Sequence, residues 1–229
     1  PSKLLKAYCA STQKCPKGYS PQMKVAIVGA GIAGLACATK LRSRAITPYL
    51  FDKGKRAGGR LSTLKLDDRE WDFGCPYINA THPDFAQQAR RWVELGWLAP
   101  WSDGPAGALV GVPTMASLVA NQCADHHVQF LAEVQHVALH DQKWFLCGPN
   151  LREGPFDAII LALPSEQAAP LLSLHDLSMA REAAGSRSAP CWSVMVAFDS
   201  PLSTFRNHYH SDGSIAGAFR TNSKPQRQG

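Results

Sequence analysis

The sequence predicts an α/β fold built on a parallel sheet, and the pattern of residues 24–51 carries most of that prediction. A short run rich in β-branched residues at 24–28 precedes a glycine-rich turn. A helical pattern follows at 33–43 and a second buried strand at 46–51. Strand, turn, helix and strand in this order form the βαβ unit of a parallel sheet. A further, wholly apolar strand is expected at 157–164, where a proline ends it.

The remaining elements are assigned in chain order from hydrophobic periodicity and turn residues. We expect residues 61–78 to be extended and residues 99–113, rich in glycine and proline, to form loops. Helices are predicted at 83–96 and 115–125. Strands are predicted at 128–131, 134–139, 143–147 and 193–198, with a turn at 140–142. The stretch from 128 to 147 therefore predicts a β-meander beside the parallel sheet.

Charge and composition exclude several classes of function. The 229-residue chain is 45% hydrophobic and carries a net charge of +6. Four of its lysines lie in residues 1–22, which contain no acid, so the rest of the chain is nearly neutral. We expect residues 1–22 to be a disordered basic tail, and we expect no nucleic-acid partner. No apolar run approaches the ~20 residues that cross a bilayer, so no membrane partner is expected either.

Cysteine usage predicts a reducing, cytoplasmic environment. The seven cysteines include no C-x-x-C pair, and several lie singly in hydrophobic stretches, as free thiols do. His208 and His210 have no neighbouring cysteine or acid pattern, so we expect no metal site. Residues 1–22 lack the apolar core of a secretory signal, and Met23 is a candidate natural start.

The strongest functional signal is a G-x-G-x-x-G turn between the first strand and the first helix. Its first glycine allows the tight turn, the second allows the backbone to approach a pyrophosphate, and the third allows helix and strand to pack closely. The N-terminus of the helix then offers unpaired N–H groups to the phosphates. The candidate phosphate-binding residues are Gly29, Ala30, Gly31, Ile32, Ala33 and Gly34.

An acidic residue and a basic loop extend this candidate site. Asp52 ends the second strand, where a carboxylate can bind both hydroxyls of an adenosine ribose and would repel the 2′-phosphate of NADP. Lys53 opens a basic loop that ends in two glycines and Arg60. Gly59 lets the backbone pass close to a ligand while the Arg60 guanidinium reaches its phosphates.

These motifs resemble those of the FAD-dependent amine-oxidase superfamily, and within it the bacterial renalase-like branch. The resemblance extends from Met23 to the C-terminus, and the glycine motifs are its specific part. It is carried by residues 28–35, Phe51-Asp52-Lys53, Gly58 to Thr63, Asp72 to Ile78, Phe156 to Pro164, Pro190 to Phe198 and Phe219 to Pro225.

The resemblance implies a two-domain flavoprotein. An FAD-binding domain would comprise residues 23–78 and 111–163, and an interleaved α+β substrate domain residues 79–110 and 164–229. FAD would be the cofactor, with Leu61 among its contacts and Val134 passing near the adenine. The substrate would be a small molecule, a misreduced dihydronicotinamide dinucleotide or an amine, and dioxygen would reoxidise the flavin to give hydrogen peroxide. No catalytic acid or base is assigned, because the flavin carries the redox chemistry.

Two alternatives remain open. Members of the family continue beyond the last residue of this chain, so the substrate domain is expected to be incomplete. The chain could then be a non-catalytic protein that keeps the nucleotide-binding half. Alternatively, it could be a flavin amine oxidase or a desaturase acting on another substrate, since the variable regions 79–110 and 165–229 would set the pocket.

Overall fold

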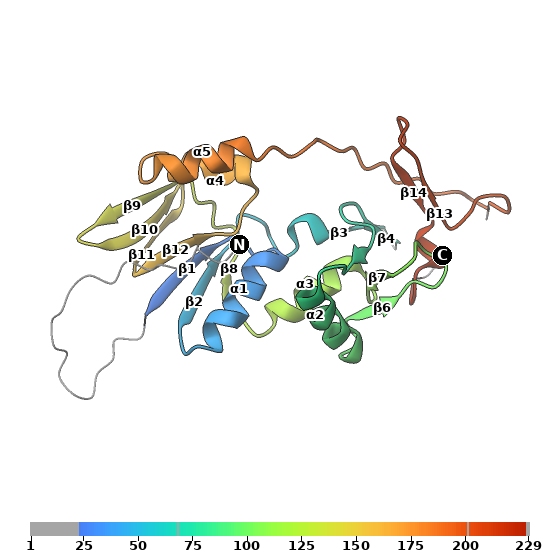
Figure 1. Ribbon diagram of the computed structural model, residues 1–229, viewed down its shortest axis with the longest axis horizontal. Helices are drawn as coiled ribbons and strands as arrows, with labels where there is room; N and C mark the ends of the chain where they lie inside the picture. The colour runs from blue at the N-terminus through green and yellow to red at the C-terminus, as the bar shows by residue number, and fades with distance from the viewer. Residues whose placement is uncertain (1–22, 68, 201, 228–229) are drawn as a thin grey trace.

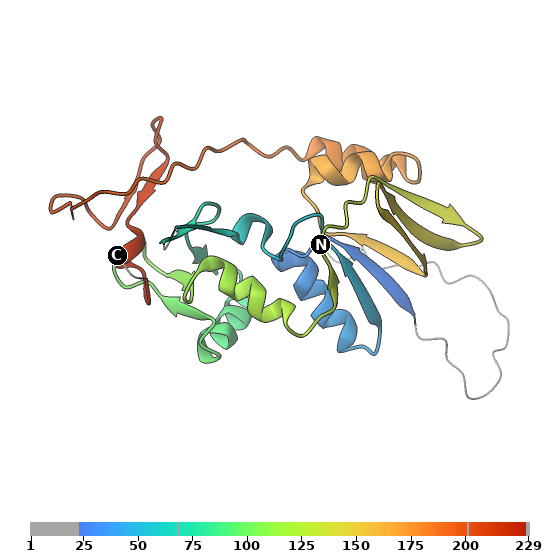
Figure 2. The ribbon, with the colours of Figure 1, turned by 180° about the vertical axis from the view of Figure 1, so that it is seen from behind.

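The computed structural model describes residues 23–67, 69–200 and 202–227. The molecule is elongated, with a parallel sheet and a β-meander at one end and small antiparallel sheets at the other (Figure 1). The view from behind shows the same division, with one extended segment running between the two ends (Figure 2). The basic tail predicted at 1–22 lies outside the described residues.

The parallel sheet confirms the predicted fold class. Its four strands stand in the order β12-β1-β2-β8, and every neighbouring pair is parallel. Helix α1 connects β1 to β2, and α3 lies beside α1 on the same side of the sheet. The bounds are β1 Lys24–Val28, α1 Ile32–Arg42, β2 Thr47–Phe51, α3 Met115–Cys123, β8 Val128–Gln129 and β12 Ala158–Leu161.

Two hydrophobic clusters fix the faces of this sheet. Because side chains alternate along a strand, Ile27 and Leu50 pack with α1 and α3 on one face. Ala26, Val28 and Phe51 face the other side, where they pack against the β-meander. A strand buried on both faces reads as a continuous apolar run, which explains why residues 24–28 were recognisable in the sequence.

The meander was predicted in part, and a helical hairpin covers it. The strands expected at 134–139 and 143–147 correspond to β9 and β10, whereas residues 128–129 form β8 of the parallel sheet and the strand at 151–156 was not predicted. Strands β9, β10 and β11 form an antiparallel sheet in sequential order. Asp141 and Gln142 turn the chain between β9 and β10 with positive φ angles of 48° and 59°. His175, between the two helices, contacts Trp144 with ring centroids 4.9 Å apart. The bounds are β9 His136–His140, β10 Lys143–Gly148, β11 Leu151–Phe156, α4 Ser165–Leu172 and α5 Leu177–Gly185.

The other end of the molecule is built from short antiparallel strands. A sheet of order β5-β7-β6 packs with α2 around Trp92 and Trp101, and β3 and β4 form a separate hairpin. Residues 99–113 were predicted as loop, but they hold β7 and most of β6, because two short strands between glycines and prolines leave almost no periodicity to detect. The bounds are η1 Gly59–Leu61, β3 Thr63–Leu66, β4 Arg69–Asp72, β5 Ile78–Asn79, α2 Pro83–Glu94, β6 Leu98–Pro100 and β7 Ala108–Gly111.

The C-terminal part holds one hairpin and a segment without regular structure. Strands β13 (His208–His210) and β14 (Gly217–Phe219) pair antiparallel and are followed by η2 (Thr221–Ser223). The strand predicted at 193–198 was wrong: these residues are extended but belong to no sheet. A strand needs a neighbour for its backbone N–H and C=O groups, and no described strand pairs with this segment.

Among the described residues, no helix combines the length and the apolar character needed to span a bilayer.

One close contact determines where α1 starts. A Cβ atom built on Gly34 would lie 1.9 Å from the Gly29 carbonyl oxygen, and one built on Gly29 would lie 2.6 Å from the Ala162 oxygen. Gly29 also has a φ of +108°, in the region that favours glycine. The turn therefore fits between α1 and β12 only if both positions lack a side chain.

The substitution Gly34→Ala should therefore lower the free energy of unfolding by about 3 kcal/mol or more, because a methyl group would meet the Gly29 backbone at 1.9 Å and the Ala162 side chain at 3.3 Å. Urea denaturation followed by circular dichroism measures the change. Gly185→Ala is the matched control, since no atom lies within 4 Å of its added Cβ, and it should change stability by about 1 kcal/mol or less. Equal stabilities of the two variants would contradict the argument.

Candidate functional site

The glycine turn leaves an open space in front of α1. The Gly29 N–H donates to the Phe51 carbonyl at 2.8 Å, which closes the turn against β2. Gly31 is the N-cap of α1, and no heavy atom lies within 4 Å of the position its Cβ would take. No side chain caps the helix, so the N–H groups of its first turn are free to bind an anion.

The loop after β2 folds back over this turn. The Gly58 N–H donates to the Ala30 carbonyl at 3.3 Å. A Cβ on Gly59 would lie 3.7 Å from the Gly31 Cα atom. The backbones of Gly31 and Gly59 thus lie side by side, as the sequence predicted for a loop that passes close to a ligand. Gly58, which makes the connecting hydrogen bond, was not among the predicted site residues.

Arg60 follows on η1 with an exposed side chain. Its carbonyl accepts from the Cys75 N–H at 2.9 Å, so its backbone is fixed while the guanidinium extends outward. Leu61, also predicted in the site, has its side chain buried in the core at 6% exposure. Lys53 extends toward α4, where its ammonium group donates to the Gln167 side chain at 3.3 Å.

Asp52 connects the glycine turn to the basic loop. Its carboxylate accepts from the Ala30 N–H and from the Gly54 N–H, each at 2.7 Å through a different oxygen. A carboxylate has about four lone-pair positions, so both oxygens keep capacity for a further donor. Asp52 is thus placed directly beside the turn, where the sequence predicted an acid that binds ribose hydroxyls.

The segment that contains Val134 lies along the same edge of the sheet. Ala132 donates its N–H to the Asp52 carbonyl at 2.9 Å, and Leu131 donates to the Gly54 carbonyl at 3.0 Å. Val134 is half-buried and packs against the core beneath the meander. The structure therefore brings together the glycine turn, Asp52, Gly59 and the chain around Val134, although more than 70 residues separate the first of these from the last.

A buried ion cluster organises the opposite side of the basic loop, and the sequence analysis missed it. Asp72, at the end of β4, is paired with Lys224 at 3.2 Å and with Arg227 at 2.5 Å, and all three side chains are at most 4% exposed. We call these three residues the Asp72 cluster. The second Asp72 oxygen accepts from the Thr63 hydroxyl at 2.7 Å and from the Met115 N–H at 3.1 Å.

The Asp72 cluster therefore connects β3, the N-terminus of α3 and the C-terminal segment. Burial lowers the pKa of the Lys224 ammonium group, and the nearby Asp72 carboxylate opposes that effect. Burial also raises the pKa of the Cys75 thiol, which lies near Lys224 and Asp72. This cluster could not be predicted from the sequence, because Asp72 is 152 residues from Lys224 and 155 from Arg227. Ion pairs between such distant residues produce no local sequence pattern.

Aromatic side chains pack around the same segment. Lys224 lies over the Trp101 ring at 5.6 Å from its centroid, and the Trp101 N–H donates to the Ser223 hydroxyl at 3.2 Å. Tyr77 contacts Phe219 and His210 through edge-to-face geometries. These contacts dock the β13–β14 hairpin on the β5-β7-β6 sheet.

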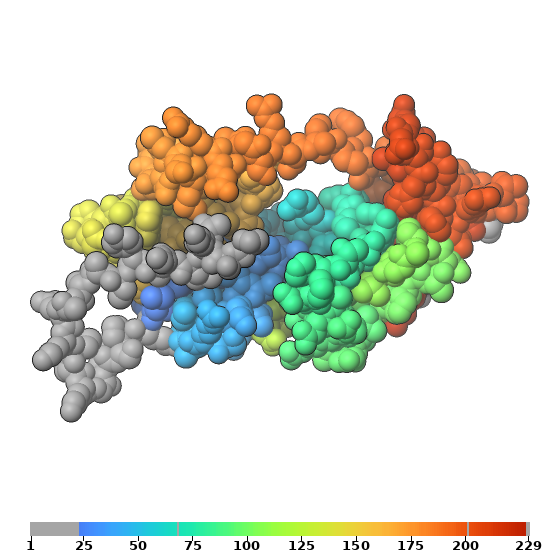
Figure 3. Space-filling view, viewed as in Figure 1, coloured from blue at the N-terminus to red at the C-terminus, as the bar shows by residue number. Residues whose placement is uncertain are grey.

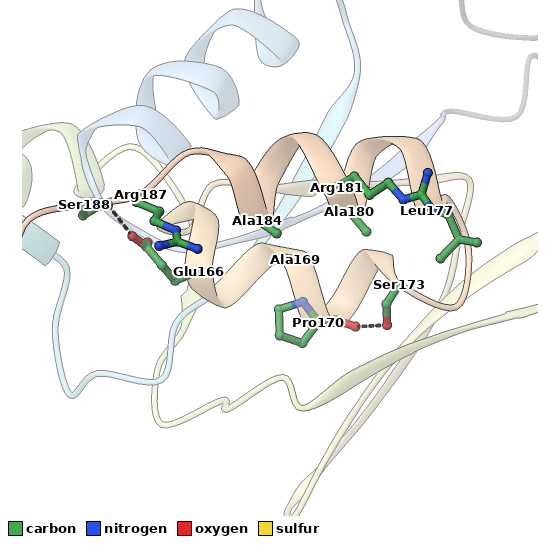
Figure 4. A pocket seen from close by; sticks show the side chains of 10 residues that line it. All are labelled: Glu166, Ala169, Pro170, Ser173, Leu177, Ala180, Arg181, Ala184, Arg187 and Ser188. Atoms are coloured by element: carbon green, nitrogen blue, oxygen red, sulfur yellow. Dashed lines mark hydrogen bonds between the residues drawn. The ribbon is translucent and has the colours of Figure 1, made fainter.

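A separate groove lies between α4 and α5 (Figure 4). Small apolar residues line its floor, and Glu166 at one end accepts from the Ser188 N–H at 2.6 Å. It includes no residue of the glycine turn or of the basic loop. The candidate phosphate site is thus the open backbone surface at the start of α1, which is separate from this groove.

A family model supports this assignment. Residues 27–93 match the model of the NAD(P)-binding Rossmann-like domain, which spans β1 to α2 and includes every element of the glycine turn and basic loop. This part of the chain is therefore similar to a Rossmann-like domain, in agreement with the observed parallel sheet.

Two curated relatives match shorter segments. Protoporphyrinogen oxidase 2 of Arabidopsis thaliana is 38% identical over 61 residues, which are 27% of this chain and 12% of that protein. A 4,4'-diapophytoene desaturase of Staphylococcus aureus strain Newman is 40% identical over 52 residues, 23% of this chain and 10% of the relative. The matched segments thus span about a tenth of each relative.

Two solved structures share the fold over a larger part of the chain. A protein from Exiguobacterium sp. 255-15, provisionally described as a protoporphyrinogen oxidase, has a TM-score of 0.52 at 13% identity, covering 72% of this chain and 64% of that one. A variant of putrescine oxidase with redesigned cofactor binding has a TM-score of 0.50 at 15% identity, covering 66% and 60%. At these identities the likeness establishes the fold.

Replacing Asp72 tests the buried cluster. Asp72→Asn should lower the free energy of unfolding by about 3 kcal/mol or more, because two buried cations lose their counter-charge. Denaturant unfolding followed by Trp fluorescence is the measurement. Asp212→Asn, in an exposed turn, removes the same charge from the surface and should have little effect. A loss of similar size in both variants would show that Asp72 has no special structural role.

Proposed function

We propose that the chain is the dinucleotide-binding part of an FAD-dependent oxidoreductase. The observation that carries the proposal is the open space at Gly31, bounded by the first turn of α1, by Gly59 and by the Asp52 carboxylate. This is the arrangement that a pyrophosphate attached to an adenosine ribose requires. The match of residues 27–93 to the Rossmann-like domain supports it.

The described residues offer hydrogen-bond donors, an acceptor and positive charge at positions suited to the pyrophosphate and ribose of FAD. The N–H groups of Ile32 and Ala33 would bind the pyrophosphate, together with the positive end of the α1 dipole. Asp52 would accept the ribose hydroxyls with the lone pairs that Ala30 and Gly54 leave available. The Val134 segment would border the adenine, and the exposed Arg60 guanidinium would reach the phosphates. Lys53 would add positive charge beside the loop.

When bound, FAD supplies the hydride acceptor of the reaction. The protein binds and orients the dinucleotide through the backbone of the glycine turn and holds the basic loop over it through the Gly58 hydrogen bond. Beyond the loop, the Asp72 cluster and the Tyr77 and Trp101 rings form the wall that would exclude water from a substrate. No described residue is assigned as an acid or base.

For the substrate, the proposal names misreduced dihydronicotinamide dinucleotides, with dioxygen as the final oxidant. The substrate would lose a hydride to become the aromatic nicotinamide. Dioxygen would take up the two electrons and the proton of that hydride, together with one proton from solvent, to give hydrogen peroxide. The support is the resemblance of residues 72–78, 190–198 and 219–225 to the renalase-like branch. Incubating the protein with isomerised NADH and measuring peroxide tests this choice. The proposed setting is cytoplasmic, without nucleic-acid or membrane partners.

Oxidation of an amine or desaturation of an apolar substrate is the second candidate. Its support is that the relatives matching a segment of this chain include a desaturase and that a putrescine oxidase variant shares the fold. An amine panel and an apolar polyene, assayed beside isomerised NADH, separate the candidates.

Gly31→Val should abolish FAD binding while the fold is retained. The valine side chain would occupy the space that the pyrophosphate needs, yet no protein atom lies within 4 Å of its Cβ position. Flavin absorbance that remains with the protein through gel filtration measures binding, and circular dichroism measures the fold. Gly185→Val, at an equally open position outside the site, is the control. Wild-type flavin content in Gly31→Val would reject the proposed cofactor site.

Arg60→Ala should weaken FAD binding by about 1.5–3 kcal/mol if the guanidinium makes a charge-assisted bond to phosphate. Titration of the apoprotein with FAD, followed by quenching of flavin fluorescence, gives the affinity. Arg44→Ala removes an exposed arginine from the far end of α1 and should leave the affinity unchanged. If Arg60→Ala also binds FAD with wild-type affinity, the Arg60 guanidinium is solvated and makes no contact with the phosphates.

A further inference from the structure

The segment from Trp192 to Phe198 is extended and pairs with no described strand. It leaves α5, crosses between the two ends of the molecule and enters the β13–β14 hairpin (Figures 1 and 2). In the space-filling view it bridges the two ends along the upper edge (Figure 3). We call residues 192–198 the bridge segment.

Large apolar side chains on the bridge segment face solvent. Trp192 is 94% exposed, Val194 81%, Val196 57% and Phe198 57%. Within the described residues, no backbone hydrogen bond joins residues 193–198 to another part of the chain. Exposed apolar side chains together with unpaired backbone groups are the features of a strand edge that pairs with another chain.

Both ends of the bridge segment are anchored. Before it, Ser188 donates its N–H to the Glu166 carboxylate. After it, Arg220 donates to the Leu202 carbonyl. The segment is therefore held extended before any partner arrives, which reduces the conformational entropy lost when a strand forms.

The sequence of the bridge segment is symmetric about Met195. Reading outward from Met195, the chain has valine on both sides, then a small residue on both sides, then an aromatic residue on both sides. The residues are Trp192, Ser193, Val194, Met195, Val196, Ala197 and Phe198.

Such symmetry has a specific consequence for antiparallel pairing. Two antiparallel copies related by a two-fold axis at Met195 place Val194 opposite the other copy's Val196, and Trp192 opposite its Phe198. All of these side chains lie on one face of the ribbon, because side chains alternate along a strand. Facing pairs of β-branched residues and of aromatic residues are those that stabilise antiparallel strands. A partner of different sequence would match this order only by coincidence.

We propose that two copies of this chain associate through the bridge segment, forming an antiparallel two-stranded ribbon centred on Met195. The interface is isologous, since the same seven residues contribute on each side. It is independent of the proposed cofactor site, because no bridge residue belongs to the glycine turn or the basic loop.

Cysteine cross-linking tests the register directly. The 229-residue chain is used with Cys9, Cys15 and Cys191 replaced by serine, so that only buried or half-buried native thiols remain among the described cysteines. In the proposed register Met195 faces itself with Cα atoms about 4.5–5.5 Å apart, within the range for a disulfide. Met195→Cys should therefore form covalent dimers under mild oxidation.

Neighbouring positions provide the matched controls. Ser193→Cys alone should not cross-link, because its two copies would be about 13 Å apart along the ribbon. A mixture of Ser193→Cys with Ala197→Cys should cross-link between the two variants, because these positions face each other. Cross-linking of Ser193→Cys with itself would indicate parallel pairing or nonspecific contact and would overturn the proposal.

Association without cross-linking provides the second readout. Sedimentation velocity over a range of concentrations should show a monomer–dimer equilibrium for the wild type. Val194→Asp should weaken the dimer at least about tenfold, because the symmetric pair introduces two buried charges opposite valine. A wild-type chain that stays monomeric throughout, or a dimer unaffected by Val194→Asp, would overturn the proposal.

Discussion

The close approach of α1 to the glycine turn is the constraint on which the site depends. Because Gly34 carries no side chain, the first turn of α1 lies directly against the Gly29 carbonyl, and the helix begins as soon as β1 ends. The helix N-terminus is thereby held at the carboxyl edge of the parallel sheet. The same edge receives Asp52 from β2 and the segment after β8. If a methyl group at position 34 pushed α1 away from the turn, the free N–H groups at the start of α1 would move away from the Asp52 carboxylate.

Two aspartates then organise the surrounding loops through backbone N–H groups. Asp52 connects Ala30 to Gly54, and Asp72 connects the start of α3 to the C-terminal segment. In each case a carboxylate oxygen accepts hydrogen bonds from backbone N–H groups that would otherwise donate to water. Such charge-assisted hydrogen bonds are stronger than those between neutral groups. The difference is in their surroundings. Asp52 keeps lone pairs for a ligand beside open space, whereas Asp72 is surrounded by its two cations and serves the structure.

Features that depend on residues close together in the sequence could be predicted from it, and features that depend on distant residues could not. The βαβ unit, the glycine turn and two of the three meander strands were predicted correctly because their signals lie within a few residues of one another. The third meander strand, β11, was missed, and the strand expected at 128–131 belongs to the parallel sheet as β8. The position of Asp52 beside the turn followed from the same local pattern. The Asp72 cluster escaped prediction because Lys224 is 152 residues away, and β6 and β7 because short strands carry little periodicity. The strand expected at 193–198 had the right composition, but composition cannot supply the neighbouring strand.

The match to a family model falls on the part of the chain that is locally specified. Binding a pyrophosphate requires backbone geometry that only a few glycines and one acid permit, so enzymes with unrelated substrates can share it. The Rossmann-like model accordingly matches residues 27–93, which hold the glycine turn, Asp52 and the basic loop. Beyond the basic loop, side chains such as Tyr77, Trp101 and Phe219 pack against one another. In the proposed function, the local geometry of β1 and α1 would therefore set cofactor binding, whereas the long-range packing around the Asp72 cluster would set substrate choice.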